Sequence, residues 1–401
     1  MRISTLSLYS NATSQLNSLQ SALARTQEQL ATNRRIVSPS DDPIASARAL
    51  QVKQSLQMNE QYATNRSAAH SSLAMTEGAL HSAGSLVQDI QELALRAGSG
   101  ILQASDREAI ATELEGRLAD LLGVANSTDG QGAYLFSGYR TTTQPYTATP
   151  DGARYDGDQG QRQLQVADSR RIPQSVPGSA VFDGNLTGNG RFQTAAAPTN
   201  TGTGAISTGS ATGTAGPGGY SYALSFTAAG TFDVSDTSVT PPVVILPNQT
   251  YTAGKPISFG GVSVEIQGTP APGDVFTVEP STKESLFTTV TNMITALRAP
   301  ADTAQDRVAL TNSLSTATGN LAHALDKILT VRASVGAHMK ELDFLDSAGD
   351  DLGIQYQATL SGLEDLDIVK AISEFSRQQT TLQAAQMSFK TMSGLSLFNY
   401  L

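Results

Sequence analysis

Two groups of aspartates have types and spacing that could support chemistry. Asp41 and Asp42 are adjacent carboxylates, which could act in acid–base catalysis or bind a metal ion. No third ligand or base converges on them, and Pro43 follows directly, so we interpret Asp42 as a helix N-cap. The segment 156–160, Asp-Gly-Asp-Gln-Gly, begins like a calcium loop but lacks the later ligands and the closing glutamate. A hairpin turn is the favoured interpretation of that segment.

Composition argues against other kinds of site. The 401-residue chain has no cysteine, which excludes disulfides, thiolate nucleophiles and cysteine metal sites. Nucleotide-binding, zinc and hydrolase motifs are absent. The four histidines lie far apart: His70, His81, His323 and His338. We therefore predict no enzyme and no catalytic, cofactor-binding or metal-binding residues.

Charge and hydropathy narrow the partners and the location. The net charge is −10 and the basic residues are scattered, which argues against nucleic acid or an anionic membrane as a partner. No apolar run approaches the roughly eighteen residues that a membrane-spanning helix needs. The N-terminus lacks the apolar core of a cleaved signal peptide. We expect a chain that stays in the cytosol or leaves by a route that reads an uncleaved end.

The two ends of the chain carry apolar residues at alternating steps of three and four, the pattern of a coiled-coil seam. The first seam contains Leu16, Leu19, Leu23, Leu30 and Val37, and the last contains Ile368, Ile372, Phe375, Leu382 and Phe389. Polar residues fill the remaining seam positions, namely Thr26, Asn33, Gln379 and Gln386. Such a pair buries little apolar surface, whereas ordering a backbone costs about 1–2 kcal/mol per residue. We expect the ends to pair with each other and to order only when many copies assemble.

Long helices are predicted next to these seams. The stretch from Ile44 to Arg96 contains no proline, and its second half has a seam from Leu73 to Ala94. Capping boxes at 105–108 and 281–284 predict two further helix starts. A seam beginning at Leu314 continues without proline to the C-terminus, which predicts an unbroken helix.

The middle of the chain changes to a strand-like pattern. Residues 133–139 are predicted as a strand, followed by a hairpin region to residue 184. The segment 185–280 is rich in Gly, Pro, Thr and Ser and nearly uncharged, with 195–219 predicted as loop. The strands predicted beyond that loop lie at 220–226, 242–246, 257–259, 262–266 and 275–278.

These patterns predict a mainly α fold with a β insertion. The expected form is a long α-helical coiled-coil rod with β-rich parts at its far end and termini that are disordered until assembly. The predicted domains are terminal coiled-coil assembly segments at 1–40 and 368–401, a helical rod domain with a β-hairpin region at 41–184 and 281–367, and an inserted β-rich outer domain at 185–280.

Several motifs resemble the bacterial flagellin family. They are Arg-Arg-Ile-Val-Ser at 34–38, Asp-Asp-Pro-Ile-Ala at 41–45, Leu-Glu-Asp-Leu-Asp at 363–367, Gln-Ala-Ala-Gln at 383–386 and Leu-Ser-Leu-Phe-Asn-Tyr-Leu at 395–401. The opening Met-Arg-Ile-Ser-Thr and the closing Ser-Leu-Phe are more similar to a junction-forming branch than to flagellin itself. The likeness covers roughly 1–184 and 281–401, whereas 186–280 is a departure.

The resemblance implies a structural subunit of the bacterial flagellum that forms the junction between hook and filament. The alternative is flagellin or another axial filament subunit. The implied partners are the first hook-associated protein on the hook side, flagellin on the filament side, other copies in a ring and an export chaperone. The implied location is extracellular, after export without a cleaved signal peptide. The expected assembly interface contains Leu16, Leu19, Leu23, Leu30, Val37, Ile368, Ile372, Phe375, Leu382, Phe389, Leu397 and Phe398.

Overall fold

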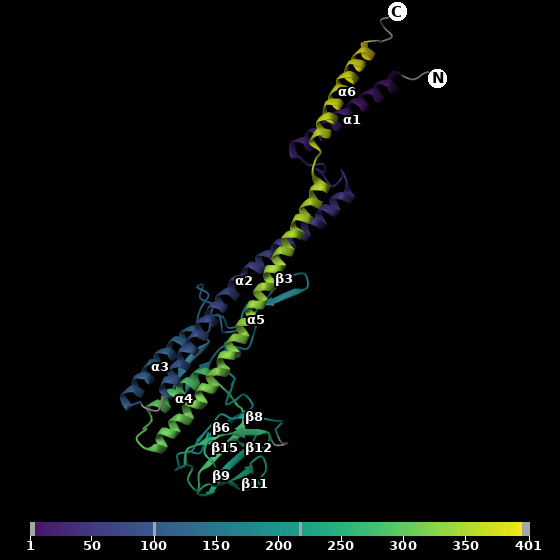
Figure 1. The fold of residues 1–401 in the computed structure, drawn as a ribbon. Coiled ribbons are helices and arrows are strands. Elements are labelled where there is room, and N and C mark those ends of the chain that lie inside the picture. Colours follow the sequence, from purple (N-terminus) through teal and green to yellow (C-terminus); the bar gives the residue numbers. More distant parts are fainter. Residues whose placement is uncertain (1–4, 99–101, 216–218, 395–401) are drawn as a thin grey trace, which may run out of the picture. The chain divides into compact units, whose positions relative to one another are not determined.

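A computed structural model describes residues 5–98, 102–215 and 219–394 of the chain (Figure 1). The chain divides into two compact units. The first unit contains residues 1–64 and 344–401, and the second contains residues 65–343. The helices are α1 (Thr5–Thr32), α2 (Pro43–Ala97), α3 (Ala104–Ala125), α4 (Leu286–Arg298), α5 (Ala304–Glu364) and α6 (Ile368–Gly394). The prediction of a mainly α fold with a β insertion is confirmed.

The long helix α2 begins where the sequence predicts it. The backbone N–H of Ala45 donates to Asp42 Oδ1 over 3.0 Å, so Asp42 caps the first turn. This hydrogen bond is the main reason that the pKa of Asp42 lies below its usual range. The predicted seam from Leu73 to Ala94 is buried along its whole length. An ion pair joins this part of α2 to α5: Arg332 Nε of α5 lies 2.7 Å from Glu77 Oε1 of α2.

The predicted capping boxes are displaced from the true helix starts. At α3 the N–H of Gln103 donates to Asp106 Oδ2 over 3.1 Å, two residues before the predicted box. At α4 the hydroxyl of Ser285 accepts from the N–H of Phe287 over 3.3 Å. The second displacement has a tertiary cause, because β16 (Lys283–Glu284) pairs with β5 (Asn185–Leu186) and keeps the backbone extended.

The C-terminal helix is broken, contrary to prediction, between α5 and α6. Asp367 Oδ1 accepts from the N–H of Lys370 over 3.0 Å and caps α6. Arg34 forms an isolated bridge with Asp365. The N–H of Arg35 donates to the Glu364 carbonyl over 2.7 Å. The break is therefore held by contacts from the other end of the chain. The local sequence pattern of residues 314–394 contains no information about these contacts.

The hairpin region is built from β1 (Tyr146–Thr149), β2 (Gly152–Tyr155), β3 (Gln163–Ala167) and β4 (Arg170–Pro173), paired as β1–β2 and β3–β4. A short 3-10 turn follows at Gly178–Ala180. The predicted strand at 133–139 is wrong, because these residues form turns with one isolated bridge, between Thr128 and Tyr134. Phe136 is nevertheless fully buried, with its ring centroid 5.5 Å from that of Phe182. Its burial comes from turns and not from strand alternation.

The inserted domain, residues 185–280, forms a five-stranded sheet in the order β11-β10-β9-β15-β6 and a three-stranded sheet in the order β12-β13-β8. Its strands are β6 (Phe192–Ala196), β7 (Ala205–Ile206), β8 (Ser210–Ala211), β9 (Tyr222–Ala228), β10 (Thr231–Asp236), β11 (Val243–Thr250), β12 (Ile257–Phe259), β13 (Val262–Val264), β14 (Ile266–Gln267) and β15 (Val275–Pro280). All five predicted strands are present. β6 and β10 were missed, and the predicted loop 195–219 contains the end of β6 and all of β7 and β8.

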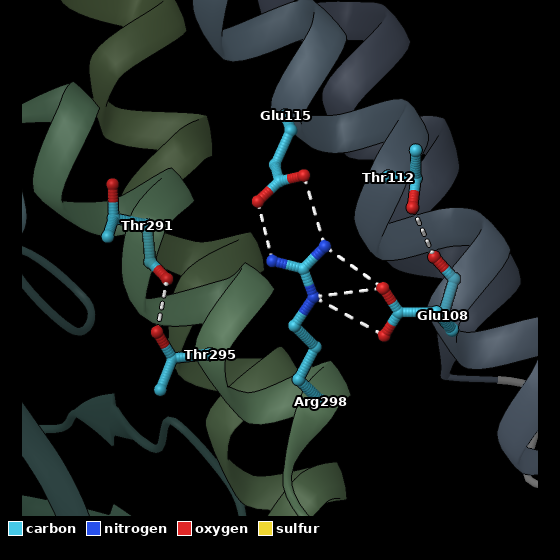
Figure 2. A network of polar contacts seen from close by, with 6 residues as sticks. All are labelled: Glu108, Thr112, Glu115, Thr291, Thr295 and Arg298. Carbon is cyan, nitrogen blue, oxygen red and sulfur yellow. Dashed lines mark hydrogen bonds and ion pairs between the residues drawn. The ribbon is translucent and has the colours of Figure 1, made fainter.

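A charged cluster links α3 to α4 (Figure 2). Arg298 Nη2 lies 3.0 Å from Glu108 Oε1 and 3.0 Å from Glu115 Oε2. The pKa of the Glu115 carboxyl is lowered, chiefly by the hydrogen bond that it accepts from Arg298. All three side chains are substantially exposed, so solvent screening keeps their contribution small.

Replacing the guanidinium with an apolar group, Arg298→Leu, removes both pairs at once. Because the pKa of Glu115 is lowered in the folded state, the stabilisation is present above the unfolded pKa of about 4.3 and disappears as the pH falls through the folded value. We expect the Tm to fall by about 1–3 °C at pH 7. The difference from wild type should shrink as the pH falls below about 4.3 and vanish only below the folded-state pKa of Glu115. Thermal melts across pH check this, with Arg48→Leu, at an exposed position of α2, as the control. A pH-independent difference would contradict it.

Candidate assembly surface

The two adjacent aspartates serve the backbone. Asp41 Oδ2 accepts from the N–H groups of Val37 and Ser38 over 3.1 and 2.9 Å, and its carboxylate also pairs with Arg25. The Ser38 hydrogen bond contributes most to lowering the pKa of Asp41. Because Asp42 caps α2, neither carboxylate is left for acid–base work or for a metal ion.

The second acidic segment also has a structural role. Asp158 accepts hydrogen bonds from the N–H groups of Tyr139, Arg140 and Gly160 at 2.9, 3.1 and 2.7 Å. The Tyr139 bond is the largest cause of its lowered pKa. Among the described residues there is no group of three or more acidic or histidine side chains that could hold a metal ion. Within the same residues, no helix is both long and apolar enough to cross a bilayer.

The chain ends meet in the first unit, where α1 and α6 lie side by side (Figure 1). The large apolar residues of the contact are all only half-buried: Leu16, Leu19, Leu23, Leu30, Phe375, Leu382 and Phe389. Tyr9 and Phe389 make an edge contact with centroids 5.0 Å apart. Of the side chains described in the two helices, only Thr26 and Ala371 are buried, at 6% and 7% exposure. The predicted pairing of the ends is present, but the seam is thin.

The seam on α6 follows a different register from the predicted one. It runs through Ala371, Phe375, Gln378, Leu382, Ala385 and Phe389. Thr26 Oγ1 donates to Gln378 Oε1 over 3.0 Å, so the two seams share a polar layer. Ile368 and Ile372 are 49% and 53% exposed and do not lie in this seam. Ala371 and Ala385 have small side chains, which let the two helices approach each other. The larger side chains of the predicted seam residues Gln379 and Gln386 would keep the helices further apart.

Val37, another predicted interface residue, does not join the seam. α1 ends at Thr32, and Asn33 has a φ of 54°, so Val37 lies beyond the helix. Its N–H instead donates to Asp41. Leu397 and Phe398 lie outside the described residues.

A joint between the chain ends was not found by sequence reasoning. Arg35 Nη2 donates to the Leu363 carbonyl over 2.7 Å, and Gln29 Nε2 donates to the Arg35 carbonyl over 2.6 Å. Lys53 and Arg34 both pair with Glu364. These bonds connect the break after α1 to the break before α6. The sequence did contain a signal for this joint, namely two adjacent arginines, Arg34 and Arg35, and three acidic residues within 364–367 near the other end of the chain. Both segments belong to the motifs that resemble a known family.

The first unit exposes large apolar side chains outside the seam. Six of them are between 67% and 83% exposed: Ile44, Leu50, Phe344, Ile354, Val369 and Met387. Scattered apolar side chains are normal on a protein surface, but many in one small unit are typical of an interaction surface. Together with the half-buried seam they make up the candidate assembly surface, defined here as the apolar side chains of the first unit that one copy leaves exposed or half-buried.

Known proteins share both the sequence and the fold. Residues 3–141 match the bacterial flagellin N-terminal helical region. Flagellar hook-associated protein 3 of Escherichia coli K12 is 29% identical over 399 residues, which is 99% of both chains. A flagellin of Serratia marcescens is 27% identical over 170 residues, or 42% of this chain and 47% of its own.

Two solved structures from Legionella pneumophila are similar over nearly their whole length. The flagellar hook-associated protein-3 is 32% identical, with a TM-score of 0.73, over 78% of this chain and 98% of its own. The flagellar junction protein FlgL is 30% identical, with a TM-score of 0.70, over 79% of this chain and 100% of its own. Identity at this level across whole structures goes beyond a shared fold. The chain therefore belongs to the flagellar hook-associated protein 3 family.

Proposed function

We propose that copies of this chain assemble in a ring at the junction between the hook and the filament of the bacterial flagellum, and that the candidate assembly surface packs between neighbouring subunits. The chain is a structural subunit of the flagellum and not an enzyme, because its relatives are structural flagellar proteins. The flagellin matches are partial, whereas the hook-associated matches span the chain. A junction role is therefore favoured over that of a filament subunit.

The proposed role of the chain ends in assembly is supported chiefly by one observation. Their seam leaves every large apolar residue that is described in it only partly buried in a single copy. The apolar contribution is about 25 cal/mol per Å² buried, so it grows when a neighbouring helix covers the exposed half. The assembled state therefore gains stabilisation that one copy lacks. Membership in a family of axial flagellar proteins supports the same conclusion.

The partners follow from this role. The hook side of the ring would meet the first hook-associated protein, and the filament side would meet flagellin. Before assembly, an export chaperone would cover the apolar face of α6, whose Ile368, Ile372 and Met387 are exposed. The chain would reach the cell exterior through the flagellar export channel. If the purified chain instead polymerised alone into long filaments, that result would favour the flagellin alternative.

The polar layer of the seam gives a test of order in the unassembled chain. We expect protease to remove residues before about Pro39 and after about Asp367 and to leave a core near 43–365. The double variant Thr26→Val with Gln378→Leu replaces a buried polar pair with apolar groups, which strengthens helix pairing. Limited proteolysis should then cut α1 and α6 several-fold more slowly. The control is Gln379→Leu, which is exposed and should change little; equal cutting of all three proteins would contradict the seam.

A charge in the seam tests assembly. Leu382→Asp places a carboxylate where neighbouring subunits would exclude water, and burying an unpaired charge costs several kcal/mol. Leu382 lies outside the second unit, so the main melting transition of the unassembled chain should stay near wild type. We expect bare hooks in electron micrographs, flagellin in the medium and loss of swimming.

The matched control is Gln379→Asp. Gln378 is unsuitable because it hydrogen-bonds to Thr26, whereas Gln379 is exposed on the same helix. Cells that carry Gln379→Asp should swim almost normally. Normal swimming by the Leu382→Asp strain would rule out α6 as an assembly surface.

A further inference from the structure

The inserted domain has a core of its own. The buried cluster in this domain contains fourteen residues, all between Phe192 and Val278. Phe226 lies at its centre, with ring centroids 5.6 Å from Phe232 and 5.9 Å from Phe276. No residue of α5 belongs to this cluster. The domain can therefore bury its apolar side chains without help from the helix beside it.

Hydrogen bonds connect the domain to the first half of α5. Gln305 Nε2 donates to the Thr201 carbonyl over 2.6 Å. Seven residues further along the same helix, Asn312 Oδ1 accepts from the N–H of Ile206 over 3.2 Å. If the domain moved away from α5, water could hydrogen-bond to both the donor and the acceptor of each bond. Each bond therefore contributes little to the free energy of docking.

The next two turns of α5 hold Gly188, close to where the chain enters the domain. Asn320 Oδ1 accepts from the N–H of Gly188 over 2.9 Å, and His323 Nε2 lies 3.2 Å from the Gly188 carbonyl oxygen. Two glycines allow this close approach. A Cβ added at Gly319 would lie 3.2 Å from the Gly188 oxygen, and one added at Gly190 would lie 3.2 Å from the His323 ring.

The interface between the domain and α5 is not closely packed. A cavity of about 600 Å³ lies there, lined by Thr194 and Ala196 of the domain and by Asn312 and Thr316 of α5, among others. Within the described residues, Asn312 Nδ2 is buried without a hydrogen-bond partner. The interface therefore differs from a domain core in both chemistry and packing.

The chain enters and leaves the domain through one narrow neck. β5 and β16 pair over two residues on each side, and the N–H of Thr187 donates to the Thr282 carbonyl over 3.0 Å. We propose that the inserted domain is a detachable module, which moves as a rigid body between a docked position on α5 and an undocked one. The two-strand neck acts as its hinge. The docked position rests on replaceable polar bonds and on the small size of Gly319.

Distance measurements on the full-length, unassembled chain test this proposal. The chain has no cysteine, so Ala229→Cys in the domain and Ala333→Cys on α5 give two unique spin-label sites, both exposed. We expect one short distance for the parent protein at neutral pH. Gly319→Leu drives a side chain into Gly188 and should convert most molecules to a longer and broader distribution.

The control is Gly336→Leu on the same helix, where an added Cβ meets nothing within 4 Å. Asn320→Ala removes a docking bond without adding bulk and should shift a smaller fraction of molecules. In both Gly319→Leu and Asn320→Ala, the near-ultraviolet circular dichroism of the domain should be unchanged. An unshifted narrow distance in Gly319→Leu, or a shift that appears only when that spectrum is lost, would overturn the proposal. Failure of the ring proposal would leave this test unaffected.

Discussion

The apolar surface of the two chain ends cannot be buried within one copy, and the organisation of the first unit follows from that limit. α1 and α6 are long, but each offers a narrow stripe interrupted by Thr26 or Gln378. Two such stripes cover only one side of each other. Further burial requires more helices, and the family to which the chain belongs consists of proteins that assemble along the axis of a flagellum.

The second unit, by contrast, buries much of its apolar surface within the chain. On α2 the seam residues from Leu73 to Ala94 are buried, and Leu314 and Leu342 are buried on α5. The inserted domain adds a closed core of its own. The chain thus combines a part that buries its own apolar side chains with an end region whose apolar side chains stay partly or largely exposed in a single copy. In this arrangement a subunit can fold most of its length before assembly while its ends remain available for packing.

Periodicity predicted much of the fold and part of the candidate site. The α2 seam and five stretches of strand in the inserted domain were predictable because burial on one face imposes a fixed period. The α6 register was not, since two heptad frames share Phe375, Leu382 and Phe389. The predicted frame adds two isoleucines and two glutamines, whereas the observed frame adds two alanines and Gln378. The small size of Ala371 and Ala385 and the hydrogen bond between Thr26 and Gln378 select the observed frame. The break before α6 depends on Arg34 and Arg35, more than three hundred residues earlier, so no local pattern could reveal it.

The central claim is that the chain ends become fully ordered only when subunits pack together. Hydrogen–deuterium exchange, measured on the unassembled chain and on the same chain in isolated hook–filament junctions, tests it directly. The account predicts fast exchange in α1 and α6 of the unassembled chain and slow exchange at residues 73–94 of α2. In assembled junctions, all three regions should exchange slowly. Exchange in α1 and α6 of the unassembled chain as slow as in α2 would contradict the account.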